Sequence, residues 1–325
     1  MFPGKQSKKK SENSSNHPAF EEIRLSCRDE LMHKGFETEV FLLHGGVGVK
    51  LLNKNHPPLA QIAHLPIIEF DFDYQGDVPL EHLSFFKLRG LKFSKSTLTS
   101  FSQLSQFCLK KLHLDGVGAS DFESLSVHRL KELSLRKTKV QSLGFLQESP
   151  VEILNLSQTE VTDRTLKILS QKPLRRLDLF KCAISNINFL NNTKIEELLL
   201  SGTQIDDLSP LSNCPIKRIE LRATLVSDLS PLSGSPIEVL YLPGSPVSSL
   251  NKIVGCPITE LNIVGLKIDD LSPLLNLPLR KLILSREQLT YEQIQIVKQL
   301  KLKYLISPGD PNNQTPEDFL KKLEN

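Results

Sequence analysis

The sequence repeats one apolar pattern at a nearly constant interval over most of its 325 residues. In the stretch Ile195–Pro215, apolar residues stand at Ile195, Leu198 and Leu200, in the spacing L-x-x-L-x-L. The pattern recurs every 21 or 23 residues, beginning at Ile67, Leu88, Leu109, Leu130, Val151, Leu174, Ile195, Ile216, Ile237, Ile258, Leu279 and Leu302. Apolar residues that keep register over eleven intervals indicate stacked units that share an elongated core.

Each unit carries the signals of a short strand followed by a compact return segment. In L-x-x-L-x-L the leucines point to one face of a strand and the residues between them to the other, so stacked units form a parallel sheet with a leucine core behind it. The motif D-L-S-P-L predicts a short 3₁₀ or helical turn that the serine caps and the proline opens. This motif occurs at Asp207–Leu211, Asp228–Leu232 and Asp270–Leu274.

We therefore predict an α/β solenoid, a leucine-rich-repeat horseshoe or arc. Its parallel β-sheet lines the concave face, its convex side consists mostly of 3₁₀ turns and loops, and helices cap both ends. A polar residue follows most strands, where it can bond backbone groups that the chain leaves open. This residue is Thr138, Thr159, Cys182, Thr203, Thr224 or Ser245.

Two units, Val151–Pro173 and Leu279–Lys301, are longer by two residues than the others. Both replace D-L-S-P-L with apolar residues at helical spacing. We predict α-helices on the convex side at these two places only, with Thr162 and Thr290 as N-caps.

The sequences before and after the repeats differ from the repeats. The segment KQSKKKSENSSN near the start is basic, rich in serine and free of apolar periodicity, which is typical of disorder. The end, from Thr315 and Pro316 on, indicates a capped helix with apolar residues at Phe319, Leu320 and Leu323. We divide the chain into a disordered basic tail over 1–16, an N-terminal cap over 17–66, leucine-rich repeats over 67–307 and a C-terminal cap helix over 308–325.

The N-terminal cap is expected to contain a helix and a hairpin. Pro18 suits the first position of a helix that ends at Gly35. Its apolar stripe is formed by Phe20, Ile23, Cys27 and Leu31. Alternating apolar residues then flank a Gly45-Gly46 turn, which predicts a hairpin. The second strand of the hairpin keeps the 21-residue register with the first unit, so it can also be a degenerate repeat.

The net charge and the cysteines limit the compartment in which the chain is expected to work and the classes of partner that it is expected to bind. A net charge of +3 gives no general argument for nucleic acid or an anionic membrane, and no run of 18 apolar residues predicts a membrane span. The five cysteines are odd in number and scattered, which suits buried free thiols in a reducing compartment. No apolar stretch of a signal peptide follows the start. We predict a cytoplasmic monomer that binds neither nucleic acid nor membrane.

The motifs that can carry chemistry favour structural interpretations. The glycine-rich loop His44–Lys50 fits neither common phosphate-binding pattern and predicts a hairpin turn. Glu69, Asp71 and Asp73 share one strand face, where a solvated acidic patch is favoured over a cation site. The histidines show no metal-ligand spacing. We predict no enzyme activity, no cofactor and no metal.

The concave face remains as the candidate binding site. Apolar and aromatic side chains cluster there beside an arginine, on an otherwise charged surface: Phe180, Leu199, Arg222, Val239 and Tyr241. Aromatic and arginine anchors are favoured in protein interfaces, although scattered exposed apolar residues are also normal on protein surfaces. We predict a non-enzymatic protein–protein interaction scaffold that binds a protein partner through these residues.

The chain resembles the 21-residue leucine-rich-repeat arrays of bacteria, especially those of the planctomycete and Lentisphaera type. The segments that match are the repeated D-L-S-P-L, Lys34-Gly35-Phe36, Gly234-Ser235-Pro236, Gly255-Cys256-Pro257 and the closing Pro316–Lys322. In the closing motif Leu320 stands where that family commonly has Trp. The resemblance covers nearly everything after residue 17 and implies the repeat fold and an interaction role. Such arrays often form the C-terminal module of serine/threonine kinase-like proteins, which implies an alternative function as a regulatory module acting on or alongside a kinase.

Overall fold

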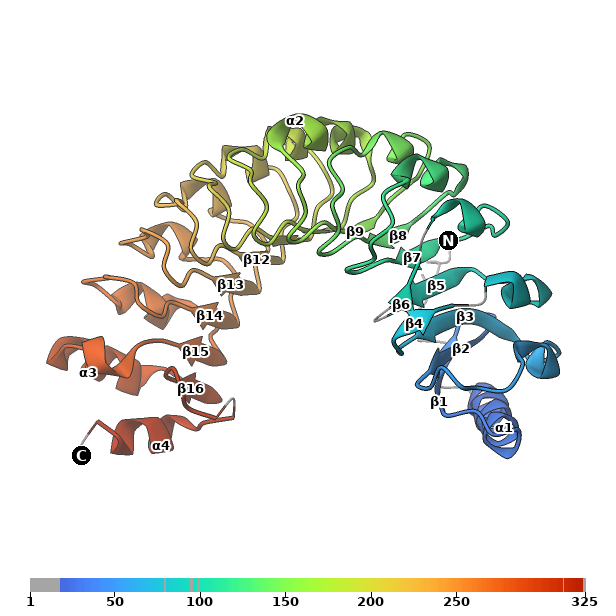
Figure 1. Cartoon of the computed structure of the whole chain (residues 1–325). Helices are drawn as coiled ribbons and strands as arrows, with labels where there is room; N and C mark the ends of the chain where they lie inside the picture. The colour runs from blue at the N-terminus through green and yellow to red at the C-terminus, as the bar shows by residue number, and fades with distance from the viewer. Residues whose placement is uncertain (1–17, 79, 94–95, 99, 312, 324–325) are drawn as a thin grey trace, which may run out of the picture.

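The computed structural model describes residues 18–78, 80–93, 96–98, 100–311 and 313–323. Within them the chain winds into an arc with strands on its inner side and turns and helices on its outer side (Figure 1). The predicted basic tail, residues 1–16, lies outside the described residues.

One sheet of fourteen strands follows the chain order. Its strands are β1 (Thr38–Leu43), β2 (Gly46–Leu51), β3 (Ile67–Phe72), β5 (Gly90–Phe93), β7 (Lys111–His113), β8 (Glu132–Ser134), β9 (Ile153–Asn155), β10 (Arg176–Asp178), β11 (Glu197–Leu199), β12 (Arg218–Glu220), β13 (Val239–Tyr241), β14 (Glu260–Asn262), β15 (Lys281–Ile283) and β16 (Tyr304–Ile306). The short strands β4 (Gly76–Asp77) and β6 (Ser96–Thr97) pair separately. Each of the twelve predicted units contributes one strand to the main sheet, as the period requires.

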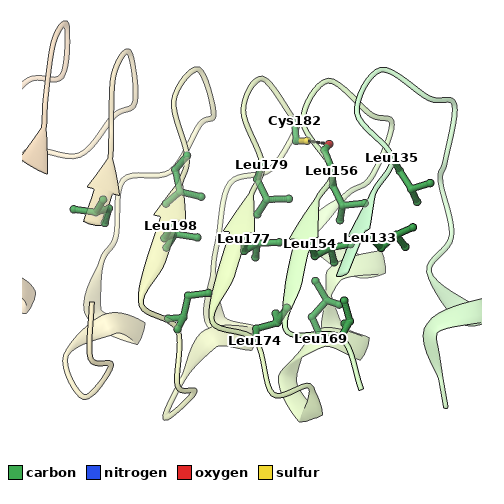
Figure 2. Packing of buried hydrophobic residues seen from close by; sticks show 14 of the residues in the cluster. Leu133, Leu135, Leu154, Leu156, Leu169, Leu174, Leu177, Leu179, Cys182 and Leu198 are labelled. Atoms are coloured by element: carbon green, nitrogen blue, oxygen red, sulfur yellow. Dashed lines mark hydrogen bonds between the residues drawn. The ribbon is translucent and has the colours of Figure 1, made fainter. Parts of the chain in front are cut away.

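The strands from β2 to β16 run parallel, and their register follows the period of the sequence. Leu177 lies beside Leu154 on one side and Leu198 on the other. Figure 2 shows the leucines of successive units stacked in columns behind the sheet. Leu198 and Leu200 are fully buried, and burial of a leucine side chain contributes about 1.5–3 kcal/mol relative to exposure. The repeated leucines therefore form the core, and the residues that can differ from unit to unit lie on the concave and convex surfaces.

The convex side consists mostly of 3₁₀ turns, and the prediction for their caps was wrong. The turn Ser209–Leu211 contains Pro210 in its first turn, as expected. However, Asp207 caps it: Oδ1 accepts the backbone N–H of Ser209 at 2.7 Å, and Oδ2 accepts the Ser209 hydroxyl at 2.7 Å. Asp228 and Asp270 do the same in their units. A carboxylate reaches the N–H two residues later readily, so the serine becomes the first residue of the turn.

The two longer units contain the convex helices α2 (Asp163–Leu166) and α3 (Tyr291–Gln299). Both begin with a capping box, as the N-cap threonines predicted. The Thr290 hydroxyl accepts the N–H of Gln293 at 3.3 Å, and the Gln293 side chain accepts the N–H of Thr290 at 3.0 Å. Helix α2 is shorter than expected because the chain continues after it as a 3₁₀ turn over Lys167–Gln171.

The N-terminal helix and hairpin follow the prediction with two corrections. Helix α1 (Pro18–His33) buries Cys27 and Leu31, but Phe20 and Ile23 are 38% and 41% exposed, so only the second half of the stripe packs on the hairpin. The hairpin turns at His44-Gly45, because Leu43 pairs with Gly46. β2 runs parallel to β3, in the register of a degenerate repeat.

At the other end, helix α4 (Pro316–Lys321) begins at the predicted cap, where the Thr315 hydroxyl accepts the N–H of Asp318 at 3.2 Å. Phe319 is fully buried beneath this helix, and the guanidinium carbon of Arg286 lies 5.2 Å from its ring centroid. Asp310 ties the segment together, because it binds Arg286 at 3.1 Å and Lys322 at 2.6 Å.

Two further expectations concern charged residues and thiols. The acidic face of β3 is ion-paired: Glu69 binds Lys111 at 3.0 Å and Asp71 binds Lys92 at 2.7 Å. Both carboxylates are buried, so the prediction of a solvated patch was wrong. All five cysteines are free, and all except Cys108 are buried.

Candidate binding surface on the concave face

The concave surface is built from three alternating positions in each unit, counted from its first apolar residue. Positions three, five and seven point away from the leucine core, as Glu197, Leu199 and Ser201 do in the unit of β11. Because the strands keep one register, residues at the same position form rows that run along the arc. The neighbours within one row therefore determine the chemical character of each part of the surface.

A hollow of about 280 Å³ opens on this surface near the middle of the arc. Its lining comes from the units of β8 to β12: Arg136, Asn155, Ser157, Asp178, Phe180, Leu199, Ser201 and Glu220. Along position seven, the small residues Ser157 and Ser201 stand on either side of Phe180. The missing side-chain volume beside the ring accounts for the hollow.

The five predicted site residues do not all meet there. Phe180 and Leu199 line the hollow, whereas Arg222, Val239 and Tyr241 do not. Arg222 is exposed on the same row as Ser201, one unit further along. Val239 and Tyr241 lie on β13, beyond the hollow. The predicted patch is thus a hollow at one end and a separate strand surface at the other.

Tyr241 belongs to a polar network. Its hydroxyl donates to Glu260, which also binds Lys281 at 2.8 Å. The guanidinium carbon of Arg218 lies 5.2 Å from the tyrosine ring centroid. Burial, together with the bond to Glu260, raises the pKa of Tyr241 to about 12. Tyr241 is therefore held in place by its neighbours and keeps its proton at neutral pH.

Asp178 is one of the two half-buried carboxylates that line the hollow, the other being Glu220. Asp178 accepts the N–H of Phe180 at 2.9 Å, which fixes the turn that presents the ring. Asn155 and Asn262 make the same bond in their own units. Burial raises the pKa of the Asp178 carboxyl above its ordinary value, while the Phe180 N–H and Arg176 act in the opposite direction. A charge at this position is not needed for the turn, because asparagine supports it equally.

The cations of the concave face fall into two groups. At positions three and five, His113 is hydrogen-bonded to Glu132 at 2.7 Å, and every Lys and Arg is ion-paired: Lys50, Lys92, Lys111, Arg176, Arg218 and Lys281. At position seven, the exposed side chains of Arg136 and Arg222 form no ion pair with the residues that the structure describes, although the charge of Arg136 acts on Asp178 and its backbone N–H donates to Asp115 at 3.2 Å. Arg136 lines the hollow, and Arg222 lies one unit beyond Ser201.

Sequence reasoning did not single out Ser157, Asp178, Ser201 or Glu220 as site residues. The signal for the serines was present, since two small residues beside an aromatic one in a row leave space that no other residue fills. The signal for Asp178 was an aspartate where the equivalent residues of two other units are asparagines.

No protein-family model and no curated protein matches the sequence. Among solved structures, the fold is similar to that of an internalin from Listeria monocytogenes, with a TM-score of 0.58 and 23% identity, covering 75% of this chain and 79% of that one. It is also similar to the functional domain of InlJ from Listeria monocytogenes, with a TM-score of 0.51 and 16% identity, covering 73% of this chain and 56% of that one. Similarity at this level of identity establishes the fold, and the chain is a leucine-rich-repeat solenoid.

The described part of the chain contains no helix that is long and apolar enough to cross a membrane. In the same part, no three His, Cys, Asp or Glu side chains are grouped in a way that could hold a metal ion.

Proposed function

We propose that the chain is a non-enzymatic scaffold that binds a protein partner on its concave face. The observation that carries this proposal is the hollow around Phe180 and Leu199, because it interrupts a face whose other charged strand positions are mostly ion-paired with one another. Solenoids present such faces as extended binding surfaces. An open hollow with an aromatic wall is the kind of feature that accepts an anchor residue from a partner.

The five predicted residues take different parts in this proposal. Phe180 and Leu199 supply apolar contact inside the hollow, and Arg222 supplies a free guanidinium at its edge. Val239 and Tyr241 extend the contact surface onto β13, where the network with Glu260 keeps the tyrosine ring rigid. A rigid aromatic residue loses little conformational entropy on binding.

The proposal is tested by affinity capture from the cell of origin, followed by mass spectrometry. Phe180→Ser and Leu199→Ser are expected to remove captured partners, because both residues line the hollow while neither is a core leucine. The matched control is Val254→Ser, which changes an apolar residue that is 40% exposed and lies outside the hollow. Partners that survive the two concave substitutions at full yield would contradict the assignment.

The resemblance to kinase-associated repeat arrays of planctomycetes and Lentisphaera supports a second candidate, a regulatory module that acts on or alongside a serine/threonine kinase. The purified chain would then change the rate of phosphate transfer by a kinase that co-purifies with it. An unchanged rate in such a kinase would leave the scaffold proposal in place and remove the regulatory one.

A further inference from the structure

The row of position seven across the hollow has a symmetric sequence: Arg136, Ser157, Phe180, Ser201 and Arg222. Backbone hydrogen bonds join each member to the unit before it. The N–H of Gln158 donates to the carbonyl of Phe180 at 2.8 Å, and the N–H of Gly202 donates to that of Arg222 at 2.8 Å. The row is therefore a fixed series of side chains and not a set of independent loop residues.

The ends of this row are basic, and beyond one end lies Asp115 of the preceding unit, which accepts the backbone N–H of Arg136. Position eight adds Lys137 beside Arg136 and Lys181 beside Phe180 in the middle unit. We call the four cations Arg136, Lys137, Lys181 and Arg222 the basic rim. Positions seven and eight of these five units contain no acidic residue, and none of the four rim cations is ion-paired within the described chain. Lys181 instead rests over the Phe180 ring, with Nζ 5.2 Å from its centroid.

The middle of the row offers hydrogen-bond donors and an apolar surface. Ser157 and Ser201 are only 2% and 5% exposed. Both line the hollow, and neither hydroxyl is hydrogen-bonded to another group in the parts of the chain described. Neither Oγ is among the buried polar atoms that lack a partner, so both hydroxyls are accessible from the hollow and can donate to an acceptor there. The hollow is thus arranged to receive acceptor groups from outside, with Phe180 between them.

We propose that the basic rim and its hollow bind an acidic, extended segment of a partner protein, with carboxylates at both ends of the segment and an apolar residue over Phe180. This inference rests on the scaffold function proposed above. Four strand intervals separate Arg136 from Arg222, or roughly 19 Å at about 4.8 Å per strand, which about six extended residues span. Each free guanidinium can bind a carboxylate through two parallel hydrogen bonds.

The neighbouring rows select a short acidic segment over a long polyanion. Positions three and five beside the rim carry Glu132, Asp178, Glu197 and Glu220, and two of these, Asp178 and Glu220, line the hollow itself. Glu197 and Glu220 already bind Arg176 and Arg218. An evenly charged polyanion, such as a nucleic acid strand, would place negative charge beside Asp178 and Glu220 in the hollow, whereas a segment with an apolar centre places its charges only at the rim.

The test is a fluorescence-anisotropy titration with a labelled synthetic peptide. Its central leucine is followed on each side by one alanine spacer and then two acidic residues, so that the peptide spans the two arginines, and a second peptide replaces the acids with their amides. We expect the acidic peptide to bind, the amide peptide to bind at least about tenfold more weakly, and added salt to weaken binding. Arg136→Gln combined with Arg222→Gln is expected to cost about tenfold in affinity.

The matched control is Arg164→Gln, which removes an exposed arginine from the convex helix α2. This variant should bind the acidic peptide as the wild-type protein does. Ser157→Val should weaken binding several-fold without a change of charge. Circular dichroism of every variant establishes that it is folded.

Two results would overturn the inference. One is equal binding of the acidic and amide peptides; the other is tighter binding of a single-stranded oligonucleotide of equal charge than of the acidic peptide. Neither result decides the outcome of the capture experiment with Phe180→Ser and Leu199→Ser. A partner lost in that experiment, together with no peptide binding here, would leave the scaffold function standing and reject the acidic ligand.

Discussion

The hydroxyl of Thr203 donates to the backbone carbonyl of Leu200 at 2.6 Å, inside the turn where the chain leaves β11. The same bond recurs in three other units, from Thr138, Thr159 and Thr224. Cys182 occupies this place in its own unit, but its thiol points to the carbonyl of Leu156 in the previous unit, at 3.0 Å (Figure 2). The polar column thus stabilises turns within a unit and, at one point, between units.

Thr203→Val should lower the free energy of unfolding by about 1 kcal/mol, because it removes a buried hydrogen bond and keeps the shape of the side chain. Chemical denaturation measures the change. Thr203→Ser retains the hydroxyl and loses only a methyl group, so it separates the hydrogen bond from packing. A valine variant as stable as the wild type would show that the hydroxyl does not contribute.

Ala223→Gly should stabilise the protein by about 0.5–1 kcal/mol. Ala223 has φ of 51°, in the left-handed region, at a position where Gly202 and Gly244 stand in the adjacent units. A left-handed conformation costs a residue with a Cβ about 1–2 kcal/mol, which exceeds the entropy cost of glycine. The reverse change, Gly244→Ala, should destabilise, although the added Cβ would meet nothing closer than 3.8 Å. Thermal and urea unfolding of both variants measure the effect, and a loss of stability in Ala223→Gly would contradict it.

The stability of the chain should fall in mild acid because of His128. Its ring is 1% exposed, and neither nitrogen has a hydrogen-bond partner among the described residues. Burial lowers the pKa of His128 below its ordinary value of 6.5, and the backbone of Phe107 opposes this shift only in part. The unfolded chain therefore takes up a proton more readily than the folded one, so stability is highest above pH 6.5 and falls as the pH drops through the folded pKa.

The variant His128→Phe isolates this effect. Phe86 and Phe107 occupy the equivalent buried place in the two preceding units, so a phenylalanine ring is compatible with the stack. Unfolding free energies measured from pH 7.5 to 5 should show a gap in favour of the variant that widens toward low pH. A constant gap would mean that another group carries the pH dependence.

Phe319→Ala should cost about 3–5 kcal/mol, the usual range for removal of a fully buried phenylalanine. Phe319 belongs to the cap that covers the last strand, and the backbone N–H of Leu305 in β16 donates to Gln314 of the same segment. Hydrogen exchange should therefore accelerate first in β15 and β16 and last in the middle of the array. Uniform acceleration along the whole sheet would show that the cap does not act locally.

The period of the apolar residues was enough to predict the fold. The spacing of 21 or 23 residues permits only one register of parallel strands, and Leu177 lies between Leu154, 23 residues before it, and Leu198, 21 residues after it. The cap of the 3₁₀ turn was not predictable in the same way, because Asp207 and Ser209 both offer oxygen atoms and only backbone geometry decides which one accepts. The stripe of α1 depended on where the helix meets the hairpin, which no local pattern encodes.

The candidate site was predictable only in part, because it depends on relations between units. Phe180 and Tyr241 are both aromatic residues on the concave surface, yet one lines a hollow and the other bonds to Glu260 in the next unit. The hollow also reflects missing volume at Ser157 and Ser201. These serines look unremarkable within their own units.

Because the sheet keeps one register, the distance between two residues along the concave face is set by the number of units between them. Each unit adds one strand interval, about 4.8 Å, to the distance between any two residues that flank it. One unit inserted between β10 and β11 would therefore move Arg136 and Arg222 apart by a fixed step while the leucine columns stay intact. Duplication or loss of whole units can therefore change the length of the partner segment that binds, while the residues that bind it stay the same.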